Sequence, residues 1–148
     1  MNRAQDSLAR GPLVIVAALA AVLAVLWGLV TLEAAHFFVP APEQVGQQFF
    51  GNLKSHDFGA ARDALSDDLR QTVSADDLRQ MNARLDRATH GIEQAYGEAS
   101  QVQDQSAPAE VKVKLKNGEE PTVQIPLIQE DGLWHITSLA PLEALSGP

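Results

Sequence analysis

The 148-residue chain contains no cysteine. Without a thiol it has no disulfide, no thiolate nucleophile, no cysteine-ligated zinc and no lipid-modified N-terminal cysteine. Basic residues are also scarce, with 11 Lys and Arg against 19 Asp and Glu and a net charge of −8. Because a nucleic-acid binder needs a basic face to displace counterions from phosphate, this balance argues against nucleic acid as a partner.

Motifs for phosphate binding and for nucleophilic catalysis are missing as well. The sequence has no glycine-rich phosphate loop and no Gly-x-Ser-x-Gly elbow. Its four histidines are not paired on one helix face, and no carboxylate run follows a calcium-loop pattern. We therefore expect no cofactor, no metal ion and no catalytic residue.

Polar residues are nearly absent from residues 13–32. Eighteen of these 20 residues are apolar, and the other two are Gly28 and Thr31. A helix of this length spans about 30 Å, the thickness of the bilayer hydrocarbon. A core helix of a soluble protein would carry a polar stripe, which this segment lacks. The sequence therefore predicts a transmembrane helix.

A cleaved signal peptide is the alternative interpretation of the same segment. Its apolar region would be only about 7–15 residues long and would end in small residues. Here Glu33 stands where a small residue is needed, and a cut after Ala41 would be followed directly by Pro42. An uncleaved anchor is the better fit, although the sequence leaves cleavage open.

The flanking charges predict the orientation of the anchor. Arg3 and Arg10 precede the span, whereas the first basic residue after it is Lys54. The more positive side stays in the cytoplasm, so the larger part of the chain is expected in the periplasm or outside the cell. The expected organisation of this single-pass inner-membrane protein is a cytoplasmic tail (1–12), a transmembrane helix (13–32), a linker (33–41) and an extracytoplasmic α+β domain (42–148).

Helical patterns occupy the first half of that domain. Apolar residues four apart predict an amphipathic helix over residues 43–55. Asp57 is placed to cap a second, short helix. Ser74 and Asp77 resemble a capping box that opens a third helix, and Gly91 is placed to end it.

The second half alternates with a period of two residues, as in half-buried strands. Strands are expected over residues 92–103, 111–115, 123–127 and 133–139, with tight turns at Asn117-Gly118 and Asp131-Gly132. Short connections make the last three strands an antiparallel meander with one apolar face, whereas the polar, irregular strand at residues 92–103 leaves the order of the sheet open. The preceding helices are available to cover that face, so we predict helices packed on a curved antiparallel sheet.

This order of elements resembles the nuclear-transport-factor-2-like superfamily, which has the cystatin-like fold. Residues 45–61 are similar to its opening, in which a helix ends in a turn with Asp and an Ala-rich helix follows. Residues 128–136 are similar to its closing hairpin, where an acidic-Gly turn precedes an inward Trp. The resemblance implies a cone of sheet and helices, and it includes small membrane-anchored bacterial envelope proteins of unassigned function.

Enzymes of that superfamily use polar residues on the inner face of the cone, so the resemblance makes His90, Tyr96 and Trp134 candidates for a pocket. A constellation of His90, Tyr96 and Asp131 is a weaker alternative, because nothing in the sequence holds these residues together. A strip of lysines on the expected outer sheet face offers either solvation or a docking surface for an acidic partner; these are Lys112, Lys114 and Lys116.

The function best supported by these patterns is a membrane-anchored binding or scaffold domain without catalytic activity. Its partner would be a protein or a small apolar ligand. Ala20, Ala24 and Gly28 would also let two membrane helices approach, which leaves a homodimer as an option, although this spacing is common by chance in an Ala-rich span. The alternatives are a subunit of a multiprotein inner-membrane assembly, such as the single-span component of type IV secretion systems, and a cone-pocket enzyme of the isomerase or dehydratase type.

Overall fold

The computed structural model describes residues 39–146, and the segment Val39–Pro148 forms a compact unit by itself. The predicted tail, the predicted transmembrane helix at residues 13–32 and most of the linker lie outside the described residues. Among the described residues, none of the helices has both the length and the apolar character needed to cross a bilayer.

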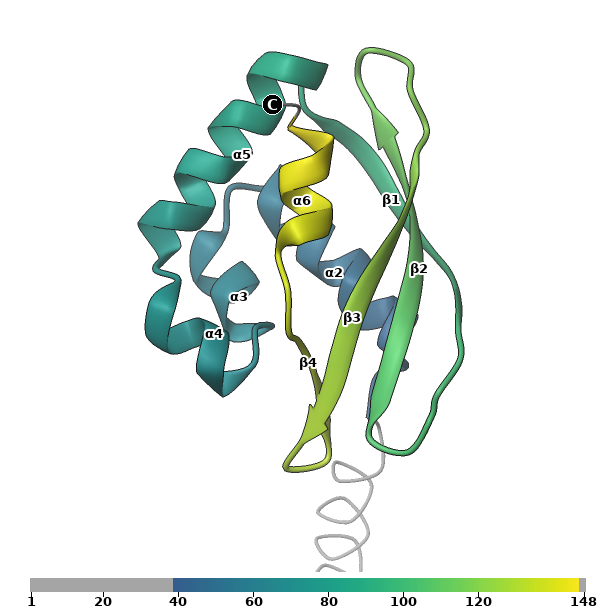
Figure 1. The fold of residues 1–148 in the computed structure, drawn as a ribbon. Coiled ribbons are helices and arrows are strands. Elements are labelled where there is room, and N and C mark those ends of the chain that lie inside the picture. Colours follow the sequence, from purple (N-terminus) through teal and green to yellow (C-terminus); the bar gives the residue numbers. More distant parts are fainter. Residues whose placement is uncertain (1–38, 147–148) are drawn as a thin grey trace, which may run out of the picture. The chain divides into compact units, whose positions relative to one another are not determined.

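Helix α2 (Pro42–Lys54) confirms the first predicted helix. The extended conformation of Ala41 and the proline at the first helical position start it, because proline has the backbone angle of a helix and needs no N–H there. Val45, Phe49 and Leu53 lie on one face and are buried. This face packs on the sheet (Figure 1).

Two further predicted helix starts are also confirmed. The Asp57 carboxylate accepts a hydrogen bond from the Ala60 N–H and caps α3 (Phe58–Asp63). Ser74 and Asp77 form a reciprocal capping box at the start of α5 (Ala75–Thr89). The hydroxyl and backbone N–H of Ser74 both donate to the Asp77 carboxylate, which lowers the pKa of Asp77.

Two short helices are not in the sequence prediction. Helix α4 (Asp67–Thr72) has no buried residue, so it lacks the apolar stripe that marks an amphipathic helix. Helix α6 (Ala140–Leu145) begins directly after the predicted end of the last strand at residue 139, and it buries Leu142. Both helices have only six residues, too few to show a repeating apolar pattern in the sequence.

The four strands form one antiparallel meander with the order β1-β2-β3-β4, which confirms the meander predicted for the last three strands and places β1, whose position the sequence left open, beside β2. Their bounds are β1 (Ile92–Ser100), β2 (Ser106–Leu115), β3 (Thr122–Glu130) and β4 (Leu133–Ile136). Alternate residues of β2 and β3 are buried, whereas their neighbours point to the outer face. The predicted alternation is therefore what places one face of the sheet in the core.

Pro126 explains why β4 is shorter than the predicted strand at residues 133–139. The last pair of the β3–β4 ladder is Leu127 with Ile136. The next residue of β3 is Pro126, whose carbonyl accepts from the Thr137 N–H at 3.0 Å. Because proline has no N–H to donate in return, the ladder stops there and the chain turns into α6.

Strand β1 is also shorter than predicted, since it ends at Ser100 instead of residue 103. Ser100 pairs with Ala109, and the following partner on β2 would be Pro108, which again has no N–H. Gln103 forms a bridge with Ser106 instead and closes the hairpin.

Candidate functional site

Within residues 39–146, buried apolar side chains from the helices and the sheet form one core inside the cone. α6 lies against the concave side of the sheet, beside α2 and α5 (Figure 1). A gap of only about 10 Å³ remains between α2, β3 and α6, where a space of that size holds at most one water molecule. The surrounding side chains are Phe49, Phe50, Ile125, Ile136, Ser138, Leu139, Pro141 and Leu142.

A larger hollow lies outside the cone, between α2, α3 and the free edge of β4. Its volume is about 220 Å³, and we call it the α3–β4 groove. A cavity of about 150 Å³ accepts a benzene molecule, so the groove has room for one apolar side chain. The groove is lined by Pro40, Val45, Gln48, Asn52, Ala60, Asp63, Ala64, Leu133, Trp134 and His135.

Asp63 supplies the negative charge of this groove. It lies at the end of α3, is exposed, and has no ion-pair partner among residues 39–146. The guanidinium of the neighbouring Arg62 keeps its charge but forms no ion pair with Asp63, and it donates to the carbonyls of Val73 and Arg70. The groove therefore presents a carboxylate available to a cation.

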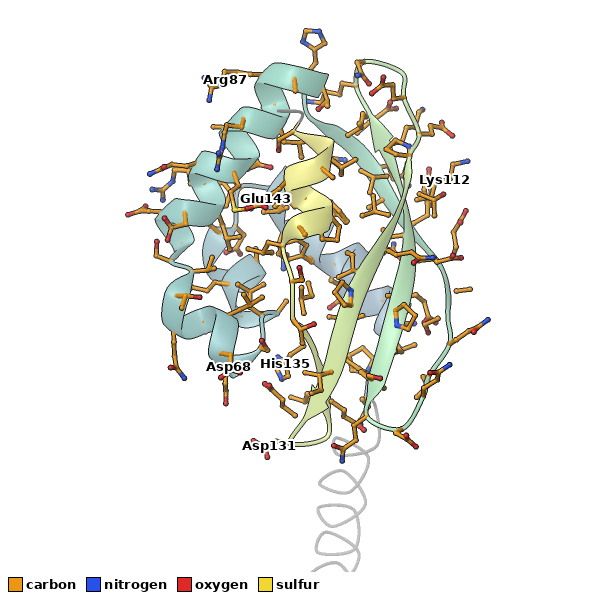
Figure 2. The ribbon with its side chains drawn as sticks, viewed as in Figure 1. Asp68, Arg87, Lys112, Asp131, His135 and Glu143 are labelled. Carbon is orange, nitrogen blue, oxygen red and sulfur yellow. The ribbon has the colours of Figure 1, made fainter. Side chains whose placement is uncertain are left out.

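His135 is the one histidine that lines the groove. Its Nδ1 atom is buried and has no hydrogen-bond partner within the described part of the chain. In Figure 2 its side chain lies on the β4 side that faces α3 and α4. Residues 39–146 contain no cluster of three or more side chains that could hold a metal ion.

The backbone of Trp134 also faces the groove without a partner. β4 pairs with β3 on one side, and on its other side Ile136 exchanges hydrogen bonds with Ala64 and Ser66. Because the hydrogen-bonding direction repeats every second residue, the N–H and C=O of Trp134 point to the same side as those of Ile136. Beside Trp134, the helix α3 occupies the place where a neighbouring strand would run. The N–H and C=O of Trp134 are therefore not hydrogen-bonded within residues 39–146.

The three pocket candidates from the sequence are not brought together. His90 is exposed in the left-handed conformation that ends α5. Tyr96 is 43% exposed on the outer face of β1, opposite Lys112. Trp134 is buried on β4, at the other edge of the sheet, as an inward residue. The constellation of His90, Tyr96 and Asp131 does not form either, because Asp131 lies in the exposed β3–β4 turn (Figure 2).

The lysine strip on the outer sheet face is largely paired. Lys112 forms an ion pair with Glu120, and Lys114 forms one with Glu93, each at 3.0 Å. The hydrogen bond and the charge of each glutamate raise the pKa of its lysine partner. This internal neutralisation favours the solvation interpretation over a docking surface for an acidic partner.

Sequence reasoning found Trp134 but missed Asp63 and the open backbone of the groove. No sequence motif distinguishes Asp63 from the other acidic residues near the predicted helix ends. The free edge at Trp134 depends on where α3 ends relative to β4, which no local signal reports. Only the buried-Trp hairpin motif at residues 128–136 pointed to this part of the molecule.

No family model matches the chain, and no curated protein matches it. Among solved structures, one similar chain comes from Campylobacter jejuni and bears the printed name "Putative NTF2-like transpeptidase". The two chains share 21% sequence identity and a TM-score of 0.52, and the match covers 67% of this chain and 99% of the other. A likeness at this identity establishes a shared fold and not a shared activity. The described domain therefore has an NTF2-like fold.

Proposed function

We propose that the protein is a single-pass, inner-membrane-anchored extracytoplasmic domain that binds or holds a partner and has no catalytic activity. The observation that carries this proposal is that side chains of the domain fill the interior of the cone. Enzymes and ligand-binding proteins need a pocket of several hundred Å³ to enclose a small molecule. The gap beneath α6 is about 10 Å³, which leaves the outer surface as the place for binding.

The hydroxyl groups of the described serines support the same proposal. A transpeptidase of the kind named for the Campylobacter protein would need an activated nucleophile, usually a serine beside a base. The described serines bond to backbone groups or carboxylates, and none bonds to a histidine or lysine within residues 39–146. Cysteine is not available as a substitute.

Methyl NMR with benzene as a probe tests whether the cone is closed to ligands. In the full chain, saturating benzene should leave the methyl signals of Ile125 and Ile136 unchanged. The Leu142→Ala variant should gain specific shifts at both residues, because removing a buried leucine leaves a dry cavity that accepts benzene. Benzene binding at these methyl groups in the unaltered chain would instead favour a cone-pocket enzyme.

A role as a subunit of a larger membrane assembly is the second candidate. The α3–β4 groove favours it, because unpaired strand edges and uncompensated charges are features that protein partners use. The two candidates share a non-catalytic domain and differ in whether the partner is transient or permanent.

A further inference from the structure

We propose that the α3–β4 groove takes an extended, basic and apolar peptide segment of a partner protein, which adds to the free edge of β4 at Trp134. The inference rests on the proposed function and names the partner chemistry for it. Three features of the described residues carry the argument: the open backbone of Trp134, the apolar groove beside it, and the unpaired carboxylate of Asp63.

The open backbone fixes the conformation of the segment. The edge of β4 is protected by a parallel bridge between Leu65 and Ile136, so the edge is closed at one end. Two residues earlier, the N–H and C=O of Trp134 have no partner among the described residues. An extended segment placed there continues the line of residues 64–66 and satisfies both groups, which is strand addition.

The groove fixes the kind of side chain that the segment carries at this position. Ala60 in α3 and Ala64 directly after it are the small residues that leave the space, and Leu133 and Trp134 form the wall on β4. Leu133 is 49% exposed although it is a large apolar residue. An aliphatic side chain of the segment would cover Leu133 and fill the groove.

Charge complementarity fixes the flanking residues. Asp63 at the rim has no ion-pair partner in the described domain, and the whole chain has a net charge of −8. A lysine or arginine beside the aliphatic residue pairs with Asp63, whereas an acidic segment is repelled. The expected partner segment is therefore aliphatic, extended and flanked by basic residues.

Trp134 itself supplies the signal for the test. The chain has two tryptophans, so Trp27→Phe leaves Trp134 as the single tryptophan. The full chain carrying this change, in phosphatidylcholine nanodiscs, is titrated with acetyl-Lys-Val-Leu-Val-Lys-amide. A saturable change of Trp134 emission is expected, with empty nanodiscs as the blank.

Two altered peptides separate strand addition from non-specific binding. N-methylation of the three central nitrogens removes the backbone donors and should weaken binding at least about fivefold. The charge-reversed peptide acetyl-Glu-Val-Leu-Val-Glu-amide should also bind at least about fivefold more weakly at low ionic strength. Equal binding of either altered peptide, or no saturable signal with the basic peptide, would overturn the proposal.

A matched pair of variants tests whether the carboxylate of Asp63 is the charge that binds the basic peptide. Asp63→Asn should weaken binding of the basic peptide about two- to fivefold, as for a partly exposed ion pair. Asp68→Asn, which removes the same charge from exposed α4 outside the groove, should leave it unchanged (Figure 2). Both substitutions lie at exposed positions, and unchanged circular dichroism melting checks that both variants fold. Equal effects of the two variants would contradict a site at Asp63.

The same titration distinguishes the proposed partner peptide from a second copy of the chain as the occupant of the groove. A Trp134 emission that depends on protein concentration without peptide would place a second copy of the chain there and overturn the proposal. Failure of the peptide leaves the benzene result untouched, and that result decides between a closed cone and an enzyme. The two proposals therefore fail independently.

Discussion

At the scale of single residues, two glycines of α2 have opposite surroundings and predict opposite effects. A Cβ atom added at Gly46 would lie 2.6 Å from Val111 Cγ2, a fully buried and stiff side chain of β2. We expect Gly46→Ala to lower the free energy of unfolding by about 1–3 kcal/mol through overpacking. Urea unfolding followed by circular dichroism measures this loss.

Gly51 is the matched control in the same helix. A Cβ atom there meets nothing within 4 Å, so Gly51→Ala should raise the free energy of unfolding by about 1 kcal/mol through helix propensity. If both variants were stabilised, the close approach of α2 to the sheet at Gly46 would be wrong.

The sequence could predict single residues only where a local pattern determines their environment. The alternation of β4 placed Trp134 inward, and the structure buries it. The predicted pocket of His90, Tyr96 and Trp134 does not form, because its residues come from the end of α5 and from the two edge strands. The separation of those strands depends on the whole sheet. Asp63 matters through its unpaired charge, which is a property of its neighbours.

At the scale of elements, periodic segments were predictable and short aperiodic ones were not. α2, α5 and the last three strands each repeat an apolar spacing over several turns or residues, and their order along the chain was predicted. β1 has no strict alternation, so its place in the sheet was left open. α4 and α6 have six residues each and no such repeat. The end of β4 depends on the proline of the neighbouring strand, since Pro126 removes the donor that the next pair would need.

α6 illustrates how much a short helix contributes when it closes a core. Leu142 is 2% exposed, and it packs beside Phe49, Phe50 and Ile125. We expect Leu142→Ala to reduce the free energy of unfolding by about 2–5 kcal/mol. Glu143→Ala changes the next residue, which is exposed, and should stay within about 0.5 kcal/mol (Figure 2).

Urea unfolding of both variants checks this prediction. A loss that is small for Leu142→Ala would mean that α6 is not part of the cooperative core. In that case α6 would act as a movable cover, and the cone beneath it would be open to a ligand.

At the scale of the whole molecule, the two proposals depend on where the domain is located. The acidic domain and its groove can meet an envelope partner only if residues 39–146 lie outside the cytoplasm. The predicted anchor at residues 13–32 and the arginines before it are the basis for that orientation. The absence of native cysteine makes the orientation measurable, because each introduced thiol is the single one in the chain.

Single-cysteine labelling of intact cells is the corresponding prediction. Ala88→Cys, at an exposed position of α5, should react with a membrane-impermeant maleimide. Ser7→Cys, in the predicted cytoplasmic tail, should react only after the inner membrane is permeabilised, and the cysteine-free chain gives the background. Both variants should stay in the membrane fraction after carbonate extraction. Labelling of Ser7→Cys in intact cells would reverse the orientation, and a mature chain that lacks residue 7 would replace the anchor with a cleaved signal peptide.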